Sequence, residues 1–568
     1  MGVKSGQGFT IRGIAVAVGI SMVLCVVGQY IAISLGMMPW STVLVAIVVL
    51  GTMTGISRVL GSRGTNIHEV VVTQSAGSVG ILIGAGVAFV LPGIWYMSGY
   101  SDFQIPIWTV GLLAAVGGLL GVIISNSFRE EFVDVEELPF PAGKAAGDVL
   151  KAGDQGGQKA KLVLAVGSIT ALFVLLRDKV LPQSLNPWVV KSLESRHIFL
   201  SIRFSPLSFA GGYLLGPYYS TTWFIGTIFA WVILMPALVN SFLDGGASLA
   251  DAINDANVFR IGVGTGIVIG SGVSFLLIGL GPKAREILRT MTRVFTTKTL
   301  RLPILAVAIA IVALCVTGVL GIPSALFAIL GVLVMSPLAA KTTGETNIDP
   351  MEIFGILMFI FASAFISLPL VEAFYVICII TIGTGVSGDI MHDYKTAKML
   401  GTDPFQITKM QILAVLGASL MAGVGLMVLF NAYGVGEGAI GDATGTLPAP
   451  QSWIVNLFVT SISGTGGLPN PAAFWGGFAF GFILQAIGGV LAYFGKRVTI
   501  SAFSFGVGVF LPMQVSIPIF LGGICRLVVQ RSKKSAERGD LVAASMLGGE
   551  GIMGFAIAVY AILPFLIP

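Results

Sequence analysis

The stretch KTTGETNIDPMEIFG, residues 341–355, sets polar and acidic side chains between two long apolar runs. A related stretch, GTNIHEVVVTQ at residues 64–74, also has Thr-Asn-Ile followed by a glutamate. Two polar breaks of the same kind, far apart in an apolar chain, predict helix starts in corresponding positions of a duplicated structure.

The composition predicts a polytopic membrane protein. The chain has 568 residues, of which 55% are hydrophobic and only 10% are charged, and its mean hydropathy is +0.93. A soluble globular protein is about 25% charged. Since a helix needs about 20 apolar residues to span the bilayer, the apolar runs predict an all-α fold of about 16 transmembrane helices. Two short runs, 206–217 and 499–512, are predicted to be half-helices or tilted spans.

Several function classes do not fit the residue content. Cysteines are scattered singly and histidines are few, so we expect no disulfide framework, no metal site and no cofactor. The sequence has no GxxxxGK[ST] motif, which argues against an ATP-driven pump. The basic residues fall in short loops, so the net charge of +5 does not indicate a nucleic-acid-binding protein.

Loop charge predicts the orientation. Residues 282–301 and residues 531–538 are rich in Lys and Arg, whereas residues 431–452 contain acids and no base. The positive-inside rule places the two basic segments and the N-terminus in the cytoplasm, so we expect a multi-pass protein of the cell membrane. The side on which the C-terminus lies is left open.

Two further pairs of segments indicate an internal duplication. KAAGDVLKAGD (144–154) resembles KTAKMLGTD (395–403), and SFAGGYLLGPYYSTTWFIG (208–226) resembles SFGVGVFLPMQVSIPIFLGG (504–523). The predicted organisation is an N-terminal transmembrane repeat at 1–281, a basic cytoplasmic linker at 282–301 and a C-terminal transmembrane repeat at 302–568. Secondary transporters are commonly built from such repeats, with the substrate site near mid-membrane.

Four blocks of sequence resemble one known family: LPFPAGKAAGDVLKAG (138–153), GDIMHDYKTAKMLGTDPFQI (388–407), FSFGVGVFLPMQVSIPIFLGGICR (503–526) and SMLGGEGIMG (545–554). They resemble the oligopeptide transporter family, which includes the yellow stripe-like metal-chelate transporters, and the chain looks like a compact prokaryotic member. The resemblance implies a duplicated helical bundle and proton-driven symport of small peptides, glutathione-like thiols or metal chelates.

Three carboxylates are candidates for proton coupling, because an ionisable group within a membrane span marks a pathway or a proton relay by default. Glu550 lies in GGEGIMGF, inside a long apolar run, and the alternative is a glutamate at the membrane edge paired with a base. Glu69 and Glu352 stand at the paired helix starts of the two halves. Their alternative role is to complement the helix dipole.

The candidates for substrate binding are polar groups at or near the spans. Asn66 and Asn347 either cap the two helices or leave free N–H groups for a substrate carboxylate. A peptide has a charge of each sign at its ends, so a base is expected beside a carboxylate in the pocket. The other candidates are Gln74, Tyr213, Gln514 and Arg526, although Tyr at a span end is more often an interface anchor.

A cytoplasmic gate held by ion pairs is a further hypothesis. Two segments of mixed charge correspond in the two halves, and the alternative for both is a solvated amphipathic stretch. The gate candidates are Lys144, Asp148, Asp389, Asp393 and Lys395.

The sequence thus favours a secondary transporter whose partners are a peptide or metal-chelate substrate, protons and the lipid bilayer. An intramembrane enzyme is one rival, since Asp389, His392 and Asp393 are close together in GDIMHDYK. A channel or facilitator is the other, but two copies of a many-helix unit fit it poorly. Assembly into a homo-oligomer is left open.

Overall fold

The computed structural model describes residues 11–36, 38, 41–59, 66–97, 101–154, 158–180, 188–189, 196–198, 200–280, 301–346, 349, 351–436, 440–441, 447–464, 470–493 and 501–566. The chain divides into two compact units. Unit 1 comprises residues 1–171, 286–463 and 548–568, and unit 2 comprises residues 172–285 and 464–547. Each unit therefore combines segments from both halves of the sequence.

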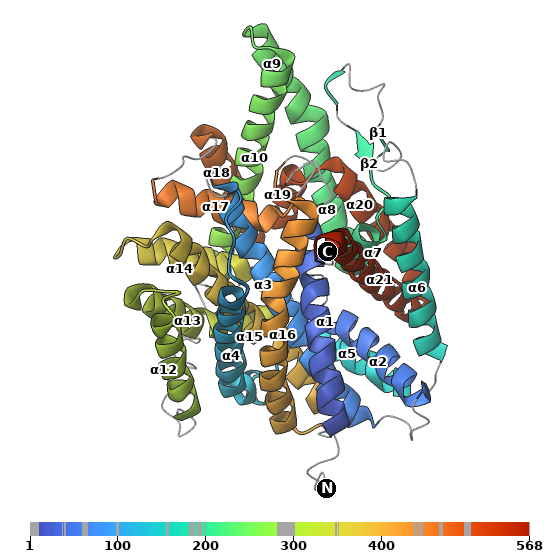
Figure 1. Ribbon diagram of the computed structural model, residues 1–568. Coiled ribbons are helices and arrows are strands. Elements are labelled where there is room, and N and C mark those ends of the chain that lie inside the picture. Colours follow the sequence, from blue (N-terminus) through green and yellow to red (C-terminus); the bar gives the residue numbers. More distant parts are fainter. Residues whose placement is uncertain are drawn as a thin grey trace. The chain divides into compact units, whose positions relative to one another are not determined.

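Unit 1 is built from helices (Figure 1). They are α1 (Ile11–Leu35), α2 (Ser41–Val59), α3 (Ile67–Val90), η1 (Leu91–Tyr96), α4 (Ile107–Arg129), η2 (Glu130–Val135), α5 (Pro141–Asp154), α12 (Arg301–Val316), α13 (Ile322–Thr346), α14 (Met351–Ser363), α15 (Leu370–Leu400), α16 (Pro404–Tyr433) and α17 (Pro450–Ile462).

Unit 2 adds a short antiparallel hairpin to its helices. Its elements are β1 (Trp188–Val189), β2 (Ser201–Ile202), α7 (Pro206–Leu215), α8 (Pro217–Ile228), η5 (Phe229–Leu234), α9 (Met235–Asp244), α10 (Leu249–Ser274), η6 (Phe275–Leu280), α18 (Pro471–Tyr493), α19 (Ala502–Phe510) and α20 (Met513–Val529). Two helices contribute residues to both units, namely α6 (Gln158–Lys179) and α21 (Lys533–Leu566).

The helical, membrane-type composition of the fold is confirmed. In the part of the chain that the structure describes, 10 helices are long and apolar enough to cross a membrane, and shorter apolar helices accompany them. The predicted number of about 16 crossings is not tested by this set. The tandem division at 282–301 also stays a prediction, and residues 282–300 lie outside the described residues.

Helices α1, α3, α4, α15 and α16 pack closely in unit 1. A ladder of side-chain hydrogen bonds joins α1 to α16: Ser21 Oγ, Cys25 Sγ and Gln29 Nε2 donate to the carbonyl oxygens of Ala414, Ala418 and Ala422, at 3.1, 3.4 and 2.7 Å. Each step is four residues on both helices, so the two helices run parallel. Within lipid, helices gain little by burying apolar surface against each other, because the lipid is equally apolar. Hydrogen bonds of this kind therefore help to hold membrane helices together.

Unit 2 contains two broken helices. Helix α7 ends at Gly216, whose φ of 90° favours glycine, and α8 begins at Pro217, where the missing N–H is no loss. The α19–α20 pair has the same form, with Leu511 and Pro512 at its break. The predicted short helices are confirmed, since α7 has 10 residues and α19 has 9.

These two broken helices pack against each other reciprocally. A Cβ on Gly212 of α7 would meet the carbonyl of Ile519 on α20, and a Cβ on Gly522 of α20 would meet the carbonyl of Phe209 on α7. The absence of side chains lets the backbones approach, as small residues do in membrane helix pairs. The two stretches that resemble each other in sequence are thus neighbours in unit 2.

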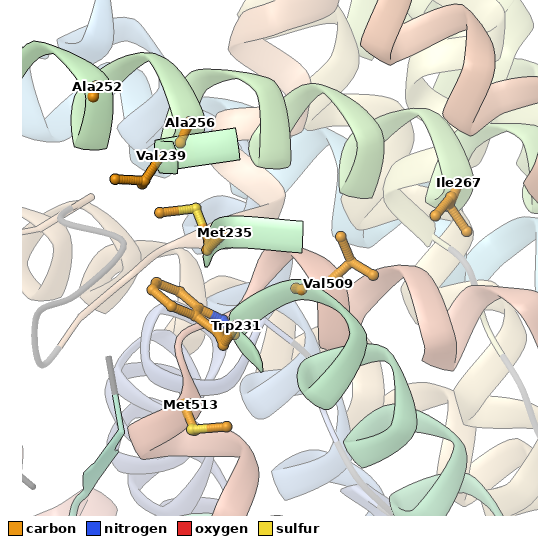
Figure 2. Packing of buried hydrophobic residues seen from close by; sticks show 9 residues of the cluster. Trp231, Met235, Val239, Ala252, Ala256, Ile267, Val509 and Met513 are labelled. Atoms are coloured by element: carbon orange, nitrogen blue, oxygen red, sulfur yellow. The ribbon is translucent and has the colours of Figure 1, made fainter. Parts of the chain in front are cut away.

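The hydrophobic core of unit 2 lies beside these breaks (Figure 2). Trp231 of η5 and Met235 of α9 pack with Val509 of α19 and Met513 of α20. The indole Nε1 of Trp231 donates to the carbonyl oxygen of Leu511 at 2.9 Å. The tryptophan therefore satisfies one of the carbonyl groups that the break leaves without a helical partner.

One helix was not anticipated. Residues 450–462, PQSWIVNLFVTSI, form α17. A helix of 13 residues is shorter than the length of about 20 that predicts a span, so the length criterion passes over it. Ser452 and Asn456 of α17 donate to the carbonyl oxygens of Ala88 and Gly93.

Candidate functional site

A buried polar cluster in unit 1 is centred on Asp393 of α15, which is fully buried. Its Oδ1 accepts hydrogen bonds from Gln74 Nε2 at 2.6 Å and from Ser78 Oγ at 3.0 Å, both on α3. Its Oδ2 accepts one from Gln411 Nε2 on α16 at 3.3 Å. Two helices, α3 and α16, thus contribute neutral donors to the carboxylate of a third, α15, and among the described residues Asp393 makes no ion pair.

The cluster continues from Gln411 towards the surface of unit 1. The hydroxyl of Tyr394 donates to Gln411 Oε1 at 3.1 Å and lies 2.9 Å from Thr408 Oγ1. Thr408 in turn donates to Asn126 Oδ1 on α4 at 3.0 Å. Tyr394 is buried whereas Asn126 is half-buried, so the chain of hydrogen bonds leads out from Asp393.

The segment LPFPAGK (138–144) lies against the C-terminal part of α15. The N–H of Gly143 donates to His392 Nδ1 at 3.2 Å, and Thr396 Oγ1 donates to the carbonyl of Gly143 at 2.8 Å. Phe140 has a φ of 40° and donates its N–H to the carbonyl of Gly344. A positive φ in a bulky residue is uncommon, so the surrounding contacts hold this segment in place.

Ion pairs brace the same end of unit 1. Lys341 Nζ of α13 lies 3.0 Å from Glu136 Oε2, and the Lys341 side chain is only 3% exposed. Lys398 of α15 lies 3.3 Å from Asp134 and 3.4 Å from Glu137, in a more exposed position. These pairs join the segment after α4 to two helices from the other half of the sequence.

The gate candidates occupy different surroundings. Lys144 and Asp148 are exposed on α5, and Lys395 is half-buried with its Nζ donating to the carbonyl of Leu138 at 2.8 Å. Asp389 is half-buried on α15. Asp393 is fully buried, so the alternative of a solvated stretch does not apply to it.

The two predicted helix starts are both present. Asn66 caps α3, since its side chain accepts a hydrogen bond from the N–H of His68, and Glu69 is half-buried in the first turn. Glu352 lies in the first turn of α14 and is 5% exposed. Asn347 lies outside the described residues. The capping role of Asn66 is therefore confirmed.

Asp349 lies between α13 and α14 with both carboxyl oxygens buried. Its carboxyl group is so close to Gly388 of α15 that a Cβ there would meet it. Burial raises the pKa of Asp349 well above its ordinary value, and the charges of Asp389 and Glu352 raise it further.

Glu550 lies in the part of α21 that belongs to unit 1, and it is 2% exposed. The glycines on either side of it allow close packing: a Cβ on Gly549 would meet the carbonyl of Gly167 on α6, and a Cβ on Gly551 would meet Val27 on α1. This explains why Glu550 is flanked by glycines.

The remaining substrate-binding candidates lie in unit 2. Arg526 Nη1 donates to the carbonyl oxygens of Tyr213 and Leu214, both at 2.9 Å, at the end of α7. Arg526 also lies 3.7 Å from Asp540. Gln514 is 3% exposed at the start of α20. Gln74 lies in unit 1, where it belongs to the Asp393 cluster.

Sequence reasoning missed two members of the Asp393 cluster and one buried arginine of unit 2. Ser78 and Gln411 are single polar residues in apolar runs, and no local signal distinguishes them from packing residues. Arg260 of α10 is fully buried and donates to the carbonyl oxygens of Val509 and Phe510 in unit 2. It had a usable signal, because it is an ionisable residue at the edge of an apolar run. Among the described residues no group of three or more His, Cys, Asp or Glu side chains could hold a metal ion.

Comparison with known proteins identifies the chain. The model of the family described as "OPT oligopeptide transporter protein" matches residues 8–298 and 287–561. The chain belongs to this family of transporters. It is therefore a multi-pass membrane protein, and it does not belong to an enzyme family.

Two relatives show how far the similarity extends. The chain is 27% identical over 571 residues to the Haemophilus influenzae protein named "Putative oligopeptide transporter", with 86% of each chain covered. It is 26% identical over 191 residues to the Zea mays "Iron-phytosiderophore transporter yellow stripe 1", with 31% of this chain and 26% of the maize protein covered.

Proposed function

We propose that this OPT family transporter takes up small oligopeptides across the cell membrane by symport with protons. The observation that carries the peptide assignment is the similarity to the Haemophilus influenzae protein along 86% of both chains. The lack of any P-loop motif in the sequence supports an ion gradient as the energy source. The basic segments support a cytoplasmic N-terminus.

Buried carboxylates support coupling to protons rather than to a larger ion. Glu352, Asp393 and Glu550 are all nearly or fully buried in unit 1. A carboxylate buried away from water is a group that commonly carries protons in membrane transporters. Among the proposed coupling residues Glu69 is the least buried.

The polar candidates supply groups that suit a peptide. Free N–H groups at a helix start suit a terminal carboxylate, and carboxylates suit the terminal ammonium. The proposed substrate-binding residues are Asn66, Asn347 and Gln74 in unit 1 and, separately, Tyr213, Gln514 and Arg526 in unit 2. The gate proposed from Lys144, Asp148, Asp389, Asp393 and Lys395 includes one half-buried cation, Lys395, that contacts the 138–144 segment.

Uptake of metal chelates is the second candidate function. It is favoured by the similarity to the maize transporter, which covers 31% of this chain. Such a chelate would be the substrate, because no described group of side chains could hold a metal ion by itself.

Transport in proteoliposomes tests both candidates. The purified chain is reconstituted, an inward proton gradient is imposed, and labelled tri- and tetrapeptides are offered beside iron and nickel chelates. We expect peptide accumulation that a protonophore abolishes, with protein-free liposomes as the control. Accumulation of chelates alone would replace the peptide assignment, and accumulation of neither would overturn gradient-driven symport.

A further inference from the structure

We propose that Asp393 holds the proton that couples transport and that its proton occupancy switches the hydrogen-bond pattern at the junction of α3, α15 and α16. This inference rests on the proposed symport. It assigns to Asp393 a role different from that of a residue in a charged gate.

The donors around Asp393 suit a carboxylate that gains and loses a proton. Gln74, Ser78 and Gln411 all donate to it, and none of them carries a charge. A permanent ion pair with a cation would favour the ionised form strongly, whereas neutral donors favour it less. Full burial of a carboxylate without a cation is costly for stability alone, which argues that the residue is kept for function.

Gln74 can accept a hydrogen bond from the protonated form of Asp393. Gln74 donates through Nε2, while its Oε1 is buried and has no hydrogen-bond partner among the described residues. When Asp393 is protonated on Oδ1, a half-turn of the Gln74 amide brings Oε1 to the new hydroxyl. The carboxylic acid then donates to an acceptor that has no partner in the ionised arrangement.

The side-chain amide of Gln411 can make the same half-turn. Its amide is held between Asp393 Oδ2 and the Tyr394 hydroxyl. A half-turn presents Oε1 to a protonated Oδ2 and Nε2 to Tyr394, whose oxygen accepts. The Tyr394 hydroxyl then donates to Thr408 Oγ1, 2.9 Å away. Each proton occupancy of Asp393 therefore has its own pattern of hydrogen bonds, and Gln74 Oε1 gains a partner only when Asp393 is protonated. Two alternative patterns of this kind are the property of a two-state element.

Other ionisable residues near Asp393 on α15 include Asp389, His392 and Lys395. Asp389 lies one turn earlier on α15 and is half-buried. The neighbouring His392 accepts from the N–H of Gly143, and Lys395 donates to the carbonyl of Leu138.

The elements packed against α15 carry further ionisable groups, several of which contact residues other than Asp393. On α3, His68 Nδ1 lies 3.0 Å from Thr402 Oγ1 and Glu69 is half-buried in the first turn. Other ionisable groups on these elements include Lys409 of α16 over the Phe405 ring, Arg129 of α4 paired with Asp134, Lys341 of α13 paired with Glu136, Glu352 of α14, Glu130 and Glu131 of η2, and Lys144, Asp148 and Lys151 of α5.

The proton balance of the step is simple. An O–H bond forms on Asp393 as a hydronium ion on the outer aqueous side becomes water. The same bond breaks when water on the cytoplasmic side takes the proton. Substrate moves inward while Asp393 is protonated. The step transfers only this proton, and no group is oxidised or reduced.

The test compares Asp393→Asn with the wild-type protein in proteoliposomes. Asparagine keeps the shape but cannot release a proton, so we expect gradient-driven accumulation to fall about a hundredfold. Exchange of labelled for unlabelled substrate without a gradient requires no proton release and should continue. The matched control is Asp255→Asn, the same change at an exposed carboxylate of α10, which should leave both activities unchanged. Driven accumulation retained in Asp393→Asn would overturn the proposal.

A second measurement covers the case in which Asp393→Asn loses exchange as well. Dicyclohexylcarbodiimide modifies protonated carboxyl groups in apolar surroundings, and peptide mapping of the wild-type protein locates the product. We expect modification of Asp393 that declines as pH rises and that substrate alters. Absence of modification at any pH that supports uptake would overturn the assignment. If the wild-type protein itself shows no proton-driven uptake, it is the proposed function that fails.

Discussion

Arg260 Nη1 on α10 donates to the carbonyl oxygens of both Val509 and Phe510, at 2.8 and 2.6 Å. These are the last residues of α19 before its break. Arg526 makes the same pair of contacts at the end of α7. A guanidinium group therefore caps the negative end of each first half-helix in unit 2.

We expect Arg260→Met to destabilise unit 2. The side chain is fully buried and lies 4.3 Å over the Trp231 ring, so no water replaces it at the two carbonyl groups. The loss of two charge-assisted hydrogen bonds should lower the free energy of unfolding by about 3 kcal/mol. Unfolding in mixed detergent micelles measures it. Arg260→Lys keeps the charge but has no forked guanidinium group, so its free energy of unfolding should fall by less. An unchanged free energy of unfolding in Arg260→Met would show that the cap is not stabilising.

The α7–α20 contact predicts that alanine substitution at two glycines has very different effects on stability. Gly212→Ala would push a methyl group into the carbonyl of Ile519, and we expect a loss of about 1 to 3 kcal/mol in stability. Gly476→Ala on α18 is the control, since nothing lies within 4 Å of its Cβ position. Thermal unfolding of the two variants should separate them. Equal midpoints would mean that the backbones at Gly212 can move apart at little cost.

The Lys341–Glu136 pair should be energetically coupled, because the Lys341 side chain is only 3% exposed and the atoms are 3.0 Å apart. A double-mutant cycle with Lys341→Met and Glu136→Gln should give a coupling of about 1 to 3 kcal/mol. The more exposed Lys398–Glu137 pair, at 3.4 Å, should give less than about 0.5 kcal/mol. Similar couplings for both pairs would contradict the dependence on burial.

Asn66 offers a way to separate capping from substrate binding. Asn66→Asp keeps an oxygen that accepts from the N–H of His68, whereas Asn66→Ala removes it and should cost about 1 kcal/mol. If Asn66 only caps α3, Asn66→Asp should transport with unchanged KM. A raised KM with unchanged stability would instead place Asn66 in the substrate site.

Much of the fold could be predicted from local sequence. The apolar runs and the pairs Gly216-Pro217 and Leu511-Pro512 carry enough information to predict membrane helices and their breaks, because span length and proline geometry are local properties. The Asn66 cap is predictable for the same reason. Helix α17 was not, because its 13 residues give no span signal.

The candidate site depended on contacts that are distant in sequence. Asp393 is part of the charged stretch GDIMHDYK, which by itself suits a solvated segment as well as a buried one. What buries it are Gln74 and Ser78, more than 300 residues earlier in the chain, and Gln411 on the next helix. Arg260 likewise finds its partners in Val509 and Phe510 from the other half.

The sequence by itself determined that this is a helical membrane protein of a transporter family, since hydropathy, helix breaks and family motifs are properties of contiguous residues. Only the tertiary structure decided which polar groups are withdrawn from water and what they contact. The reason is physical: the energy of a buried carboxylate or guanidinium depends on the donors and acceptors around it, and in this chain those come from helices far apart in sequence.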